Sequence, residues 1–152
     1  MALGTTLPAW PALVFAYFEP ISLVLGFYTA LSNPSAFVTA QIPTTSSTLT
    51  PVPPSALILA NTLGNIYALL AGLAVVCTFI TREPRVTWWY LFFVACGDIG
   101  HLYASYAVMG RDVFLDVGGW NAMVWGNVGV TAFLHVNRGL TIVGAFGKSG
   151  AG

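Results

Sequence analysis

The chain has 152 residues, of which 57% are hydrophobic and only 7% are charged, with five basic and five acidic residues. A soluble domain carries about 25% charged residues, so ten charges could not cover a surface that faces water. The composition argues against a soluble globular domain, a disordered chain and a nucleic-acid-binding protein. It indicates that most of the outer surface faces lipid.

Four apolar stretches are each long enough for a transmembrane helix, which needs about 20 apolar residues. They cover 12–31, 56–80, 88–109 and 121–143. Turn-forming residues separate them, because 32–55 is rich in Pro, Ser and Thr, 81–87 reads TREPRVT and 110–119 reads GRDVFLDVGG. The sequence therefore predicts an all-α polytopic membrane protein. One membrane domain over 1–152 would fold as a four-transmembrane-helix bundle.

The basic residues predict the orientation of these spans. With four spans, both termini share a side with loop 81–87, and the basic residues there are Arg82, Arg85, Arg138 and Lys148. The opposite side carries only Arg111. The excess of basic residues predicts that both termini are cytosolic and that loop 32–55 is lumenal. Arg138 is expected to snorkel toward the cytosolic interface.

The two cysteines, Cys77 and Cys96, both lie inside apolar stretches. Their number and placement do not indicate a disulfide framework. We expect both to be small buried hydrophobic side chains.

Glu19 is the first ionisable residue within a predicted span. Such residues are costly in lipid and indicate a functional site by default. Pro20 follows it and has no N–H for the carbonyl of Ala16, so the sequence predicts a kink with a free acceptor there. The alternative is a protonated glutamate that forms a structural hydrogen bond with a neighbouring helix.

Asp98 lies near the middle of the third span, with His101 and Ser105 on the same helix face. Burial favours the neutral form of an aspartate, so an acid and a base are available side by side. Gly97 and Gly100 would allow close approach of another helix. A structural Asp–His bond that locks two helices is the alternative.

Two further spans contribute amide and hydroxyl groups. Asn61 and Asn65 are four residues apart and share a face of the second span. The fourth span carries a polar stripe of Asn127, Thr131, His135 and Arg138. These groups could orient a substrate or an acid, or could simply join helices.

The central polar residues of all four spans fall at similar depths, which predicts a polar pocket inside the bundle. The predicted catalytic residues are Asp98, Glu19 and His101. The predicted substrate-binding residues are Asn61, Asn65, Tyr67, Tyr103, Trp120, Trp125, Asn127 and Thr131. The aromatic members could stabilise a developing cation, although packing is the commoner role of such rings.

Several classes of site are missing from the sequence. It has no phosphate-binding GxxxxGK[ST] loop, no GxGxxG after a strand, no GxSxG and no CxxC. With two histidines only, a di-iron hydroxylase is not indicated. We therefore expect neither a metal nor a cofactor.

Four short segments carry a family resemblance: FEPISLVLG, ANTLGNIY, GDIGHLY and WNAMVWGNVG, one in each span. Over about residues 10–145 they resemble a fungal family of small four-span membrane proteins. That family is labelled only as a domain of unknown function, and its members often occur in secondary-metabolite clusters. The resemblance implies a place in the endoplasmic reticulum.

Two better-understood groups are more distantly similar. One is the sterol-isomerase-like membrane fold (the EXPERA class), whose lipid-facing cavity is lined by carboxylates, His, Asn and Trp. The matching residue types in this chain are Glu19, Asp98, His101, Trp120 and Asn127. The other group is the fungal membrane-bound terpene cyclases, which use buried carboxylic acids to protonate an epoxide or olefin.

The residues and the resemblance together predict a membrane-embedded isomerase or cyclase for a hydrophobic, terpenoid-type substrate that enters from the bilayer. Asp98 or Glu19 would be the general acid, kept protonated by burial. His101 would recharge Asp98 or remove a proton from the substrate. A cycloaddition catalyst, which needs shape and one hydrogen-bond donor, is a variant of this prediction.

Two other classes stay open at this point. The chain could be a non-catalytic scaffold or lipid-binding protein of the endoplasmic reticulum, or an oligomeric carrier or channel. Expected partners are a hydrophobic small molecule, the bilayer and other membrane enzymes of a pathway, with no nucleic acid.

Overall fold

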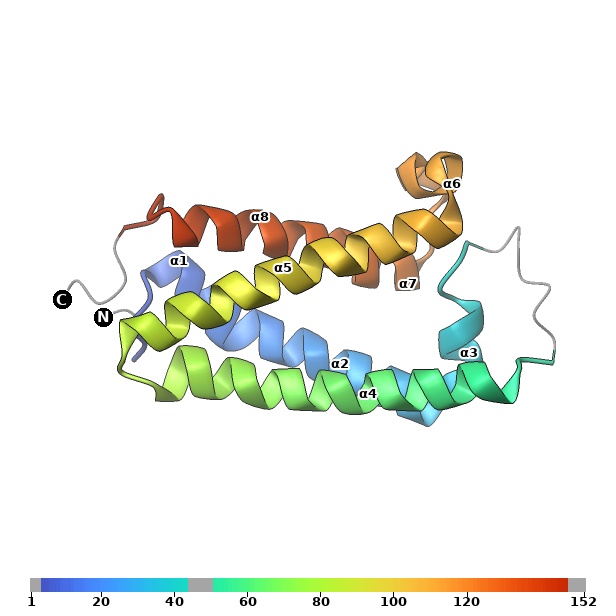
Figure 1. Cartoon of the computed structure of the whole chain (residues 1–152), viewed down its shortest axis with the longest axis horizontal. Helices are drawn as coiled ribbons and strands as arrows, with labels where there is room; N and C mark the ends of the chain where they lie inside the picture. The colour runs from blue at the N-terminus through green and yellow to red at the C-terminus, as the bar shows by residue number, and fades with distance from the viewer. Residues whose placement is uncertain (1–3, 44–50, 148–152) are drawn as a thin grey trace.

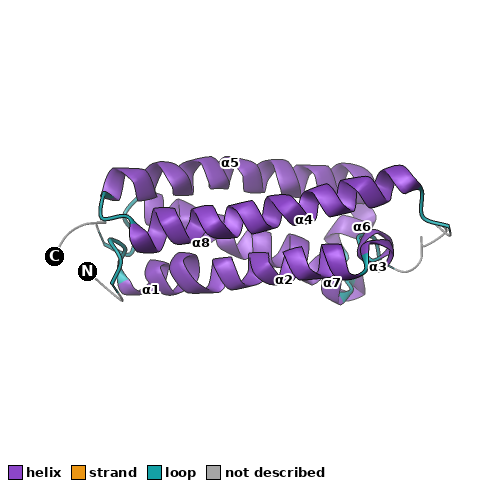
Figure 2. Ribbon diagram, turned by 90° about the horizontal axis from the view of Figure 1, so that it is seen from below, coloured by secondary structure: helices purple, strands orange, loops and turns teal. Residues whose placement is uncertain are grey.

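The computed structural model describes residues 4–43 and 51–147, and the regular elements in these ranges are helices (Figure 2). The first long helix comprises α1 (Ala9–Ala12), a π-helical segment (Leu13–Phe18) and α2 (Glu19–Ser32). The second comprises α4 (Pro54–Ala74) and the π-helical segment Val75–Ile80. The third is α5 (Pro84–Met109). The fourth comprises α7 (Ala122–Val124), the π-helical segment Trp125–Gly129 and α8 (Val130–Ile142).

Shorter elements fill two of the connections. They are α3 (Pro34–Thr39), α6 (Arg111–Leu115) and a 3-10 turn at Val117–Gly119. The predicted loop 32–55 thus contains a helix, and its residues 44–50 lie outside the described part, as does Lys148. Each of the four predicted spans coincides with one long helix to within a few residues.

Three of these helices are long and apolar enough to cross a membrane: Ala9–Ser32, Pro54–Ile80 and Pro84–Met109. They make the chain compatible with an integral membrane protein. The helix over 122–142 is not one of the three, because Asn127, His135, Asn137 and Arg138 lower its hydropathy. All four of these side chains are buried or half-buried, so its polar face is turned into the protein.

The long helices form two antiparallel pairs, α2 with α4 and α5 with α8 (Figure 1). The first and last described residues lie at the same end as the turn 81–83, because Arg82 donates a hydrogen bond to the Gly4 carbonyl and a Cβ added at Gly147 would lie 3.8 Å from Pro8. We call this end of the bundle the terminal end. The opposite end, which carries α3 and α6, is called the loop end. This arrangement brings Glu19, Asp98 and Arg138 together from three helices.

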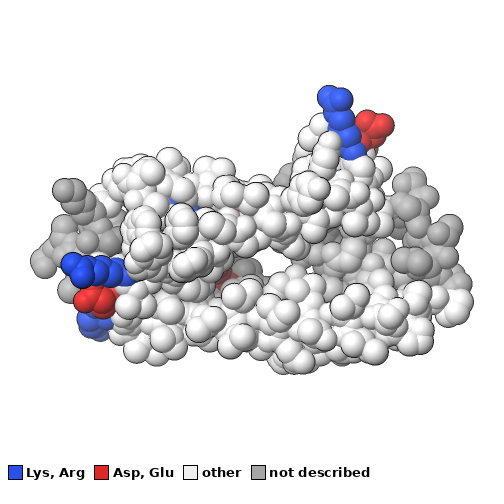
Figure 3. Space-filling view, in the orientation of Figure 1, with Lys and Arg blue, Asp and Glu red and all other residues white. Residues whose placement is uncertain are grey.

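Each end of the bundle has its own apolar core. At the terminal end, Phe15, Leu91 and Leu134 pack with Leu7, Ala12 and Val14. At the loop end, Ala30, Phe37 and Ala60 pack with Met123 and Tyr67. Between the two cores, Figure 3 shows a hollow that separates the α5–α8 pair from the α2–α4 pair.

The outer surface is apolar, as expected for contact with lipid. Lys and Arg atoms are visible only near the two ends in the view of Figure 3, apart from a trace of blue between the helices. The expectation for the cysteines is wrong, because Cys96 is exposed and Cys77 is only half-buried, and both are free. In a membrane protein, a side chain in an apolar stretch can face lipid as readily as the protein interior. The apolar surroundings of the two cysteines in the sequence therefore do not indicate whether they are buried.

The expected kink at Pro20 takes a different form. The helix continues through Pro20, and the π-helical segment before it widens the register, so that the Glu19 N–H bonds to the Val14 carbonyl. Pro20 has no N–H to donate. In this wider register the carbonyl group left without a backbone donor is therefore that of Phe15 rather than that of Ala16. The hydroxyl of Thr78 lies 3.2 Å from the Phe15 oxygen and donates to it.

The contact between α2 and α4 depends on Gly64. A Cβ at this position would lie 3.2 Å from Ala30 Cβ and from Leu31. We expect Gly64→Leu to destabilise the protein by about 1–3 kcal/mol through overpacking. Thermal unfolding in detergent micelles would measure it.

Gly72→Leu is the matched control. Gly72 lies on the same helix, and a Cβ added there would have no neighbouring atom within 4 Å, so this variant should unfold like the parent protein. Equal melting temperatures for the two variants would contradict this packing.

Candidate functional site

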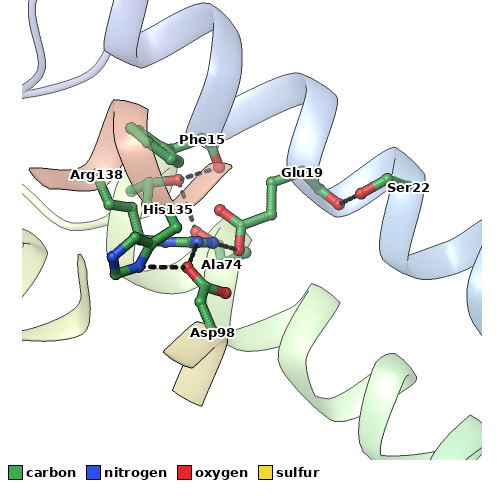
Figure 4. Close-up of polar contacts among 8 residues, drawn as sticks. Phe15, Glu19, Ser22, Ala74, Asp98, His135 and Arg138 are labelled. Carbon is green, nitrogen blue, oxygen red and sulfur yellow. Dashed lines mark hydrogen bonds and ion pairs between the residues drawn. The ribbon is translucent and has the colours of Figure 1, made fainter. Parts of the chain in front are cut away.

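The centre of the candidate site is Arg138 on α8. Its guanidinium donates one hydrogen bond to Asp98 Oδ2 through Nη1 and another to Glu19 Oε1 through Nη2 (Figure 4). Three helices, α2, α5 and α8, are therefore joined by one ionic cluster. Relative exposures of 1% for Arg138, 2% for Glu19 and 8% for Asp98 show that the cluster is buried.

Arg138 does not snorkel to the interface, so that expectation is wrong. A lone arginine near the end of a span extends toward water. Here two carboxylates lie within its reach inside the bundle, and pairing with them outweighs hydration of the guanidinium. The guanidinium carbon also lies 5.3 Å from the centre of the Phe15 ring, which adds a cation–π contact.

The two carboxyl groups have different surroundings. Glu19 Oε2 is buried and has no hydrogen-bond partner among the described residues. Asp98 Oδ1 is not one of the buried unpartnered atoms, and the Asp98 side chain keeps 11% exposure against 3% for Glu19. Acidic atoms are visible at the inner end of the hollow in Figure 3, so the cluster borders this hollow. Asp98 is the more accessible of the two carboxyl groups, and Glu19 is the more deeply buried.

Two histidines accompany Asp98. His135 Nδ1 lies 3.7 Å from Asp98 Oδ2, and its side chain is 33% exposed. His101, the predicted partner, is half-buried one turn along α5, where it faces the backbone of Asn127 and lies within electrostatic range of Asp98. The imidazole that forms an ion pair with Asp98 when protonated is that of His135.

The charges of the cluster do not balance. Two ionised carboxylates against one guanidinium leave one net negative charge, and an uncompensated charge is strongly disfavoured in a low-dielectric interior. One additional proton, on a carboxyl group or on His135, would neutralise the cluster. The site is therefore built to hold one exchangeable proton.

In addition to Glu19 Oε2, three buried polar atoms around the cluster have no hydrogen bond within the described ranges. They are Tyr90 Oη, Arg138 Nε and His135 Nδ1. A buried polar group without a partner costs about 1–3 kcal/mol. So many at one place mark a site under functional constraint rather than a packed core.

The predicted asparagines do not join the cluster. Asn61 Nδ2 donates to the Leu57 carbonyl on its own helix, 2.9 Å away, and Asn65 is exposed. Asn127 Nδ2 donates to Gln41 Oε1, 2.7 Å away, and thereby ties the fourth helix to the segment after α3. Thr131 is half-buried. Among the described residues, no group of three His, Cys, Asp or Glu side chains is arranged to hold a metal.

The predicted aromatic residues also lie elsewhere. Trp120 packs edge-on against Trp125 and Phe114, with ring centres 5.1 and 6.2 Å apart, near α6 at the loop end. Tyr103 is 69% exposed. Tyr67 packs in the loop-end core. The structure therefore brings together Asp98 and Glu19, with His101 nearby, and separates them from the aromatic set.

Sequence reasoning did not place Arg138, His135 or Tyr90 in the site. The signal for Arg138 was charge balance, because two acids inside one bundle require a cation. Arg138 also belongs to the polar stripe of the fourth helix, on which it follows His135 by three residues. Tyr90 gave no signal, since it lies beside Trp88 and Trp89 and reads as part of an interfacial belt.

Comparison with known proteins gives one match. Residues 4–148 match the family described as domain of unknown function DUF7704, so the chain belongs to this family. This agrees with the resemblance to a family labelled as a domain of unknown function. No curated protein and no solved structure matches the chain.

Removing the guanidinium tests the cluster. Arg138→Met would leave two buried carboxyl groups without their counter-ion, and loss of one partner of a buried pair costs about 3–5 kcal/mol. We expect a correspondingly large loss in the free energy of unfolding, measured in lipid nanodiscs. Arg85→Met, at an exposed position, should have little effect.

Replacing all three members together makes the test specific. Glu19→Gln, Asp98→Asn and Arg138→Met in one chain leave no buried charge in the cluster, so stability should return toward that of the parent protein. A triple variant less stable than Arg138→Met alone would refute the account based on charge.

Proposed function

We propose that this family member is a membrane-embedded acid–base enzyme, an isomerase or cyclase that acts on a hydrophobic substrate. The observation that carries the proposal is the buried cluster of Glu19, Arg138 and Asp98, which borders the hollow between the helix pairs and has Asp98 as its more accessible carboxyl. The family resemblance narrows the substrate to a terpenoid-type molecule of fungal secondary metabolism.

Asp98 is the proton donor in this proposal. A carboxyl group with one accessible oxygen can protonate an alkene carbon or an epoxide oxygen, which creates a carbocation or opens the ring. Arg138 then stabilises the aspartate that forms, since it already donates a hydrogen bond to Oδ2. The surrounding apolar residues exclude water, which would otherwise trap the cation.

The same site can take the proton back. The cation loses a proton from a neighbouring carbon to Asp98 or to an imidazole, and His135 is the imidazole in ion-pair range of Asp98. The cycle consumes no net proton and needs no oxidant or reductant. Substrate and product would have the same mass, as expected of an isomerase or cyclase.

The proposed membrane arrangement has four spans in the endoplasmic reticulum. The fourth helix, 122–142, is similar in length to its neighbours and lies antiparallel to α5 (Figure 1). Its charged and amide groups are paired inside the bundle, which removes the main obstacle to burial in lipid.

Comparative product analysis tests the catalytic role. Membranes that contain the parent protein should convert a terpenoid olefin or epoxide into a new product of equal mass. Asp98→Asn should lower this rate by about 10²–10⁴-fold, the usual contribution of a general acid. Glu19→Gln should have a smaller effect, and Asp112→Asn, at an exposed position, should have none.

Identical product profiles from the parent protein, Asp98→Asn and an empty vector, at equal membrane abundance, would refute the enzyme proposal. A scaffold or lipid-binding role, in which the ionic cluster only holds the three helices together, would then explain the geometry better.

The topology can be tested independently. An even number of spans places both termini on one side, and the basic residues Arg82 and Arg85 predict that this side is cytosolic. Tags at either terminus should be cleaved by protease added to intact microsomes, whereas a tag inserted at 116–119 should be protected. Opposite protection of the two termini would exclude four spans.

A further inference from the structure

Tyr90 is a half-buried residue whose hydroxyl lies inside the site, and the proposed reaction gives it no role. It lies on α5 and packs against the terminal-end core. Its hydroxyl is within electrostatic range of Glu19, Arg138, Asp98 and Cys77. No hydrogen bond from this hydroxyl is present among the described residues.

Glu19 Oε2 is the natural partner for this hydroxyl. It is a buried acceptor without a hydrogen bond in the described part of the chain, and the Glu19 carboxyl group lies within interaction range of the Tyr90 hydroxyl. A phenol is a donor and an ionised carboxylate accepts only. A hydrogen bond between them, direct or through one water molecule, would satisfy both groups at once.

Such a bond would act on one charge state of Glu19. Hydrogen bonds donated to a carboxylate favour its ionised form. Glu19 would then have two donors, Arg138 and Tyr90, whereas the only side-chain donor on Asp98 within the described ranges is Arg138. Of the other titratable groups, His135 and His101 have Asp98 as their carboxyl partner, and Cys77 lies within electrostatic range of the Tyr90 hydroxyl.

We propose that Tyr90 is a positioning residue that keeps Glu19 ionised, so that the exchangeable proton of the cluster resides on Asp98, the more accessible carboxyl. This inference rests on the proposed acid–base function. The two donors to Glu19 would offset its deeper burial, which by itself favours the neutral form of a carboxyl group. Tyr90 would act through Glu19 and would not touch the substrate.

Infrared spectroscopy of the full chain in lipid nanodiscs tests the inference without any substrate. A neutral carboxyl group gives a C=O stretching band that is separate from the bands of carboxylates. Labelling the side-chain carboxyl group of aspartate with ¹³C shifts the neutral-carboxyl band only if the protonated group belongs to an aspartate. An Asp98→Asn sample shows whether exposed Asp112 and Asp116 contribute.

We expect the label to shift the band in the parent protein and in Tyr103→Phe, the matched control on the same helix. In Tyr90→Phe the proton should move to Glu19, so the isotope shift should be lost while the neutral-carboxyl band remains. Tyr90→Met, which also lacks the hydroxyl, serves if the phenylalanine variant does not fold. A merely structural role for Tyr90 would change stability and leave the isotope shift unchanged.

Three results would overturn the inference: a parent band that the label does not shift, no neutral-carboxyl band at all, or the same isotope shift with and without the Tyr90 hydroxyl. The second result would show that neither carboxyl group of the cluster carries the proton. Failure of the proposed enzyme function would appear separately, as an unchanged product profile in Asp98→Asn, whatever the infrared spectra show.

Discussion

A single guanidinium, that of Arg138, pairs with two carboxyl groups on two other helices, and this constraint shapes the bundle. Charges can remain in an apolar interior only when they are paired, so α2, α5 and α8 must converge where Arg138 lies. The helix α4 takes no part in the cluster and is held to α2 by Gly64 and Ala30 instead. The two helix pairs are thus tied firmly near the cluster and can separate beyond it, where the hollow lies.

The unequal number of acids and bases gives this arrangement its chemical meaning. A balanced ion pair would be sufficient to join helices, and a second carboxyl adds a burial cost with no further structural need. What the second carboxyl adds is a place for a proton. Because Asp98 keeps an accessible oxygen and Glu19 does not, an exchangeable proton can reach a molecule in the hollow by way of Asp98. This asymmetry supports an acid–base role over a purely structural one.

The sequence was sufficient for the helices and for the two acids, and insufficient for the partners of these acids. Long apolar stretches locate spans because lipid imposes a minimum length, and Glu19 and Asp98 were conspicuous because ionisable groups are rare there. The direction of Arg138 depends on which helices are neighbours, so no local pattern could reveal it. The side-chain amide of Asn61 donates its hydrogen bond within its own helix, which the sequence pattern does not reveal. Aromatic rings are so common in this chain that depth in the membrane alone could not assign Trp120 or Trp125 to the site.

The π-helical segments connect the backbone to this site. Each wide turn accommodates an extra residue, which rotates the following helix face by about 100° relative to an uninterrupted α-helix. In the first helix, the residues before this turn pack against the fourth helix and those after it pack against α4. Phe15 lies within the π-helical segment Leu13–Phe18 and belongs to the terminal-end core, and Glu19 directly follows this segment and enters the ionic cluster. Ala30 lies further along α2 and contacts the position of Gly64. Because the helix stays continuous through the wide turn, one stretch of chain supplies all three contacts.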